Sequence, residues 1–206
     1  MRAPSAVSRS AGTVFLNVHF DKPYEPIFIG LLGALVSLGK RPTTVLELGG
    51  GAAPRLDRLI DAIRGNPFSV HDLSRIELSG RGVGAVPRFN MPFELGLAVA
   101  VSLSERRRPR HGFVLLETKP FRLQRSLSDM NGYDPLIHKG TQGGAVRTMF
   151  EAFAGRGAAD ITAARRLVRR LDQVADRLRR SHGASTIFSR AICDELTATA
   201  TRLRGQ

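Results

Sequence analysis

The chain has 206 residues, 42% of them hydrophobic and 24% charged, which are ordinary fractions for a globular protein and exclude a fibrous or wholly disordered chain. Its formal net charge of +13 is compatible with a polyanionic partner and equally with an anionic small molecule. Arginine outnumbers lysine 27 to 4, however, a skew that can reflect genomic base composition. The charge alone therefore does not choose a partner.

The length fits one core domain with an appendage. We expect a flexible leader over residues 1–12, an α/β domain over 13–140 and a helical extension over 141–206. A single cysteine, Cys193, excludes an intramolecular disulfide, and neither a secretion signal nor a membrane-spanning run is visible. These features predict a soluble, cytoplasmic protein without a membrane partner.

Strand-like and helical patterns alternate along the first two thirds of the chain. Residues 13–20 are β-branched and aromatic and end at a turn signal, whereas 25–38 carry apolar residues at helical spacing. Further strands are predicted at 43–48, 68–71, 112–117 and, more weakly marked, 134–138, and further helices at 55–63 and 93–103. Between them, the glycine-rich residues 75–88 predict a mobile surface loop that could close as a lid.

Alternating strands and helices imply right-handed βαβ units and a parallel sheet. We therefore predict an α/β fold with a doubly wound parallel sheet of about five strands, and for the site we consider the strand order 2-1-3-4-5. Beyond residue 140 only helices are predicted, at 143–153, 161–180 and 187–203. The second of these has an apolar stripe and an arginine-rich outer face, which is most simply a solvated face.

The strand order also predicts where a ligand would bind. In open parallel sheets, ligands bind outside the carboxyl ends of the strands, where the strand order reverses. That point lies between the first and third predicted strands, and Glu94, at the start of the helix after the loop, would reach the same crevice. The loops that follow these two strands would bring together His19, Asp21, Tyr24, Asp72, Ser74 and Arg75.

Two segments resemble a known family. The runs Phe68-Ser-Val-His-Asp-Leu-Ser74 and Pro92-Phe-Glu-Leu-Gly-Leu-Ala98 resemble nucleoside 2-deoxyribosyltransferases and nucleotide N-glycosidases. The resemblance covers roughly residues 13–140 through about a dozen positions, and it implies a flavodoxin-like layout, which that family shares with TIR domains. It departs from the family at residues 17–24, where the transferases have a glycine- and arginine-rich loop.

The resemblance implies an activity and its residues. Glu94 matches the family's nucleophile at the anomeric carbon of the sugar, and Asp72 and Ser74 match positions with family roles. Several TIR domains cleave nicotinamide from NAD, so bacterial defence by nucleotide depletion is an implied setting. The substrate would be a nucleotide, a nucleoside or an NAD-like molecule.

Such chemistry suits the residues. Breaking an N-glycosidic bond builds positive charge on the sugar, which a carboxylate such as Glu94 stabilises or attacks. Asp72 could protonate the leaving base if burial raises its pKa, and His71 or His19 could do so instead. A phosphate would suit Gly49-Gly50-Gly51 or the turn before Phe93. Glu94 and Asp72 are thus the predicted catalytic residues, no cofactor or metal is predicted, and the predicted substrate contacts are Asn17, His19, Asp21, Tyr24, Arg55, His71, Ser74, Arg88 and Asn90.

Each prediction has a plainer alternative. With Pro92 as first helical residue, Glu94 would be the third and could simply cap the helix. Asp72 and Ser74 could merely form an Asx turn. The whole site could belong to a non-catalytic nucleotide-binding or signalling module, and the arginine-rich helix to a nucleic-acid-binding adaptor, which we favour less. The C-terminal helices could also join copies of the chain into a homo-oligomer.

Overall fold

A computed structural model describes residues 12–48, 54–75, 78–79, 86–87, 89–105, 110–154 and 160–205. Its centre is a five-stranded sheet in which every neighbouring pair is parallel. The order β2-β1-β3-β6-β7 is the predicted flavodoxin-like order 2-1-3-4-5. The strands are β1 (Thr13–Asn17), β2 (Arg41–Thr44), β3 (Phe68–Asp72), β6 (Gly112–Glu117) and β7 (Leu136–Ile137).

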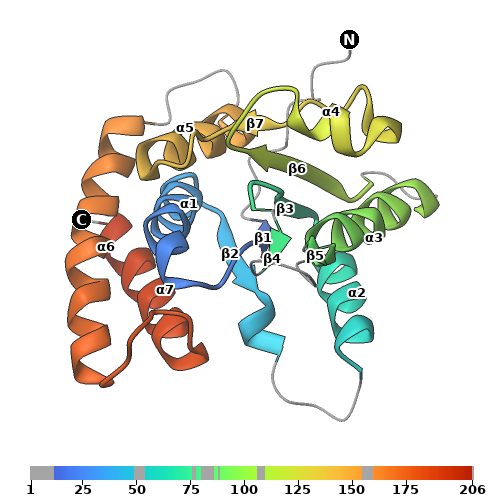
Figure 1. The fold of residues 1–206 in the computed structure, drawn as a ribbon. Coiled ribbons are helices and arrows are strands. Elements are labelled where there is room, and N and C mark those ends of the chain that lie inside the picture. Colours follow the sequence, from blue (N-terminus) through green and yellow to red (C-terminus); the bar gives the residue numbers. More distant parts are fainter. Residues whose placement is uncertain are drawn as a thin grey trace.

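Helices cover both faces of the sheet (Figure 1). Phe15 of β1 packs with residues of α2 (Arg55–Gly65) and α3 (Asn90–Ser104) on one face. On the other face, β1, β3 and β6 share a larger apolar cluster with α1 (Glu25–Ser37), α5 (Gln142–Phe153), α6 (Ile161–Ser181) and α7 (Arg190–Arg204). The helical extension therefore belongs to the main core.

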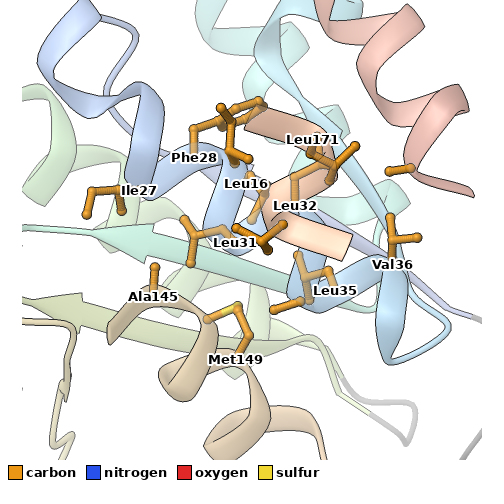
Figure 2. Close-up of a cluster of buried hydrophobic side chains, with 14 of the residues drawn as sticks. Leu16, Ile27, Phe28, Leu31, Leu32, Leu35, Val36, Ala145, Met149 and Leu171 are labelled. Carbon is orange, nitrogen blue, oxygen red and sulfur yellow. The ribbon is translucent and has the colours of Figure 1, made fainter. Parts of the chain in front are cut away.

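The helix α1 is the centre of that larger cluster. All but two residues of α1 are buried, because the sheet and three helices surround it, so it is apolar on every side instead of amphipathic. Figure 2 shows Leu31, Leu32 and Leu35 of α1 among Met149 of α5 and Leu171 of α6. This packing holds the amino end of α1, and hence the loop after β1, against the carboxyl edge of the sheet.

Short elements complete the described chain. They are the 3₁₀ turns η1 (Lys22–Tyr24), η2 (Val45–Leu48) and η3 (Ser128–Met130), the helix α4 (Arg122–Ser126), and an antiparallel hairpin of β4 (Leu78–Ser79) and β5 (Val86–Pro87). The hairpin falls in the segment predicted as a loop, and α4 was not predicted. The predicted glycine turn at 49–51 and the leader up to residue 11 lie outside the described residues.

Two boundaries differ from prediction for local reasons. The second strand ends at Thr44, not at residue 48, because its side-chain oxygen accepts from the Leu46 amide while Glu47 accepts from the Thr44 amide, which turns the chain. Helix α3 begins at Asn90, before Pro92, and its first turn is closed by the bond from the Phe93 amide to the Phe89 carbonyl, 3.0 Å.

Candidate functional site

Polar residues occupy the carboxyl edge of the sheet where apolar ones would be expected. Asn17 ends β1, Asp72 ends β3, Glu117 ends β6, and His138 follows β7. Each is at most 2% exposed. Buried polar groups are stable only with hydrogen-bond partners, so these four side chains must be held by neighbours.

Asp72 is held by three donors. Its Oδ1 accepts from the Ser74 amide at 2.7 Å, which confirms the Asx-turn interpretation. Its Oδ2 accepts from the Tyr24 hydroxyl and lies 3.2 Å from Nε2 of His138. The Gly140 amide donates to Nδ1 of the same histidine at 3.2 Å, so Nδ1 accepts and Nε2 carries the proton toward Asp72.

These donors determine the charge of Asp72. Burial favours the neutral acid, but the interaction with His138, then the Ser74 and Tyr24 bonds, outweigh it and lower the pKa of Asp72 to about 2. Burial and the adjacent carboxylate raise the pKa of the Tyr24 hydroxyl well above its usual value. Asp72 is therefore an ionised acceptor, and the condition under which it would protonate a leaving base is not met.

Glu94 is a buried carboxylate in a different setting. It is 6% exposed, and its Oε1 lies 3.5 Å from Nη2 of Arg55. Burial raises the pKa of Glu94 above its usual value, while a hydrogen bond from Asn17 and the Arg55 charge partly offset this. Because α3 begins at Asn90, Glu94 is its fifth residue, and the alternative in which it caps the helix from the third position is wrong.

Asn17 connects Glu94 to a chain of buried hydrogen bonds. Its Nδ2 lies 3.1 Å from Nδ1 of His71, whose Nε2 lies 2.8 Å from the Ser69 hydroxyl. The same hydroxyl lies 2.8 Å from Nε2 of His111, whose Nδ1 is 2.8 Å from the backbone carbonyl of Asn66. That carbonyl can only accept, so every bond in the chain has one allowed direction if both histidines are neutral.

The two histidines of this chain of hydrogen bonds, His71 and His111, are kept neutral. Burial and the neighbouring His111 lower the pKa of His71 to about 3, and burial lowers that of His111. Because Nδ1 of His71 accepts the hydrogen bond, the side-chain amide nitrogen of Asn17 must point toward His71 on β3. That nitrogen has two hydrogens, so it also donates to Glu94. The polar chain therefore fixes the donor that faces the Glu94 carboxylate.

The two predicted catalytic carboxylates lie on opposite faces of the sheet edge. Side chains alternate along a strand, and Asn17, two residues after Phe15, faces α2 and α3. Asp72, two residues after Val70, faces α1. The structure brings both carboxylates to the carboxyl edge, but each bonds to its own set of neighbours.

Several residues predicted to line a crevice between β1 and β3 do lie together. The Tyr24–Asp72 bond and the ion pair between Asp21 and Arg75 join the loops that follow these strands, and the His19 ring packs edge-on against Tyr24 with centroids 5.3 Å apart. Asn90, by contrast, is the exposed first residue of α3. Arg88, the other predicted contact beside it, lies outside the described residues.

Sequence reasoning missed the partners that complete these networks. His138 follows a two-residue strand, Ser69 lies within the quoted run 68–74 but had no predicted role, and His111 has no motif around it. Glu117 is fully buried and is bound by Arg122, whose Nε lies 2.5 Å from Oε2, and by the Thr118 amide, 2.5 Å from Oε1. For the pair of Glu117 and Arg122, the sequence signal was a strand of consecutive apolar residues that ends in a glutamate.

Two exposed aromatic residues lie at the start of α3, shortly before Glu94 in the sequence. Phe89 and Phe93 are 67% and 57% exposed, and their spacing of four residues places them on one side of the α3 start. Two hollows of the described surface lie away from Glu94, one of ≈ 260 Å³ beside Thr43 and Asn66 and one of ≈ 420 Å³ beside Lys22. Neither of these hollows is the candidate site, which rests on its chemistry.

Comparison with protein-family models, with curated protein sequences and with solved structures gave no match. Within the described residues, no helix is both long and apolar enough to cross a bilayer. The same residues contain no group of three or more histidine, cysteine, aspartate or glutamate side chains arranged to hold a metal ion. The site residues themselves must therefore support any functional assignment.

Proposed function

We propose that the protein cleaves or transfers the N-glycosidic bond of a nucleotide, a nucleoside or an NAD-like molecule, with Glu94 acting on the anomeric carbon. The observation that carries the proposal is the state of Glu94: a carboxylate buried at the carboxyl edge of a doubly wound sheet and free of a capping role. Burial that raises its pKa makes the carboxylate more basic, while Asn17 and Arg55 favour its ionised form.

The step balances with this one carboxylate. A Glu94 oxygen attacks the anomeric carbon or stabilises its positive charge, the C–N bond breaks, and the electron pair leaves with the nucleobase, which takes a proton from water. Water or an acceptor base then attacks the sugar carbon and frees the carboxylate. Asn17 holds one side of the carboxylate throughout, and the exposed Phe89 and Phe93 rings offer a stacking surface for the base.

A non-catalytic nucleotide-binding module is the second candidate. The ion pair between Glu94 and Arg55 favours it, because a salt-bridged carboxylate is not free to attack. In that case Arg55, whose side chain is 64% exposed, would bind the phosphate of a nucleotide instead of Glu94. The N-glycosidic bond of the nucleotide would not break.

The test is release of free base from a panel of nucleosides, nucleotides and NAD. We expect Glu94→Gln to lower the rate by at least about a hundredfold, the usual loss on removing a group that stabilises the transition state, while ligand binding is retained. Glu151→Gln, a change on the exposed face of α5, is the matched control. Binding by both proteins without base release from any member of the panel would favour the binding module.

A further inference from the structure

A group of exposed arginines lies along the outer face of α6. We call it the arginine stripe, and all its members are exposed. In Figure 1, α6 is the long orange helix at the left-hand margin of the molecule, remote from α2 and α3. The stripe consists of Arg165, Arg166, Arg169, Arg170, Arg177 and Arg180.

The spacing of these arginines defines a straight basic surface. At 100° per residue, the six positions fall within an arc of about 140° and extend over about 22 Å of helix. The opposite side of the same helix is apolar and is buried against α1, with Leu167, Val168 and Leu171 in the core. The stripe is thus held rigidly, and its direction relative to the sheet is fixed.

Two carboxylates of α6 lie close to the stripe, since Asp176 falls within its arc and Asp172 about 20° outside it, but each is engaged by a side chain that is not part of the stripe. Asp172 accepts a 2.8 Å bond from Gln142, and Asp176 pairs with Arg179, which also binds Glu25. At the amino end, Asp160 lies 3.5 Å from Arg166 of the stripe, but both side chains are more than half exposed, and exposed pairs of this kind contribute little. From residue 161 to residue 171 the helix has four exposed arginines and no carboxylate, whereas an ordinary solvated helix face mixes charges of both signs at spacings of three and four residues.

Like charges at those spacings destabilise a helix. Arg165 precedes Arg169 by four residues, which is a mutually repulsive arrangement. A bound polyanion would relieve this repulsion. At the carboxyl end of α6, the ≈ 420 Å³ hollow is lined by Lys22, Arg179 and Arg180, and also by Asp176.

We propose that the arginine stripe binds the phosphate backbone of a nucleic acid without reading its sequence. Arginine suits phosphate because its planar guanidinium donates two parallel hydrogen bonds. The helix has no aromatic residue that could stack on a base, so contact is limited to the backbone. An anionic membrane is disfavoured because the apolar face of α6 is already buried in the core and cannot enter a bilayer.

The test is the binding of a fluorescent 20-base-pair duplex of arbitrary sequence over a range of salt concentrations. We expect the triple change Arg165→Gln, Arg169→Gln and Arg177→Gln to weaken binding at least tenfold and to flatten the salt slope by about 0.9 for each phosphate that the variant no longer neutralises. The matched control removes the same charge from exposed positions of α7, with Arg190→Gln, Arg202→Gln and Arg204→Gln. It should bind within twofold of the unaltered protein.

The remaining outcomes are also decisive. Absence of duplex binding would overturn the proposal. Equal weakening in the stripe and control variants would also overturn it, because binding would then depend only on the net charge of the protein. Binding to phosphatidylserine vesicles that depends on the stripe, with no dependence for the duplex, would assign the surface to a membrane instead. The melting temperature of the stripe variant at low salt should be no lower than that of the unaltered protein. If the glutamine variant misfolds, the corresponding lysine variant replaces it, and this variant should retain duplex binding because it keeps the charge.

Discussion

Asp72 and Glu94 are carboxylates buried at the same edge of the sheet, yet their pKa values shift in opposite directions. Burial raises the pKa of both, but only Asp72 has enough donors to reverse the shift. At the scale of the residue, this difference separates the two carboxylates. Asp72 joins β3, the start of α1 and the end of β7, whereas Glu94 retains the basicity that the proposed reaction requires.

Replacing Asp72 with asparagine should destabilise the fold. The new amide would present hydrogens to the Nε2 hydrogen of His138 or to the Tyr24 hydroxyl, so a buried polar group would lose its partner. We expect the free energy of unfolding to fall by about 3 kcal/mol, measured by urea denaturation. Asp129→Asn, at an exposed position of η3, is the control, and a decrease no larger than that of the control would show that Asp72 does not hold these elements together.

His71 should make the protein sensitive to mild acid. Its pKa is about 3 in the fold, against an ordinary value near 6.5 in the unfolded chain. Between these values only the unfolded state binds the proton, so the stabilising contribution is complete above about pH 6.5 and falls by about 1.4 kcal/mol per pH unit below it. His111, whose pKa is also lowered, adds to the same trend.

The measurement is thermal unfolding at pH 7 and pH 5. His71→Gln, which can still donate and accept in the polar chain, should lose less stability over this interval than the unaltered protein. His182→Gln, at the exposed end of α6, should behave as the unaltered protein does. Equal acid sensitivity in all three proteins would mean that the protonation of His71 does not govern this stability.

At the scale of the element, α1 depends on close contact with α6. A Cβ at Gly33 would lie 2.5 Å from Cγ2 of Val168, whereas a Cβ at Gly96 of α3 would meet nothing within 4 Å. Gly33→Ala should therefore cost about 1–3 kcal/mol through overpacking. Gly96→Ala should instead stabilise the fold by up to about 1 kcal/mol through helix propensity, and similar melting temperatures for the two variants would contradict the close packing.

Local patterns predicted the elements better than their ends. Apolar periodicity located α1, α2 and α6 within two residues at each boundary. It failed at β2, where side-chain bonds of Thr44 and Glu47 turn the chain, and at the start of α3, where Pro92 was taken for the first residue. Such side-chain to backbone bonds compete with regular structure and leave no periodic trace.

At the scale of the whole molecule, the alternation of strands and helices was enough to predict a doubly wound parallel sheet, and the resemblance added the flavodoxin-like order 2-1-3-4-5. The carboxyl-edge location of the site followed from that order. The hydrogen-bond chain from Asn17 through His71 to His111 did not, because it depends on the register that pairs β1 with β3 and on a histidine about 40 residues further along the chain. Side chains that become neighbours only through the pairing register of two strands cannot be identified as hydrogen-bond partners from one sequence.

The rate of nucleobase release as a function of pH tests the central claim most directly. If Glu94 must be ionised, the rate should fall with decreasing pH through a pKa above the usual glutamate value, because burial raises that of Glu94, and Glu94→Gln should remove both the activity and this acidic limb. Base release by the Glu94→Gln protein at an unchanged rate and with the same pH profile would contradict the account.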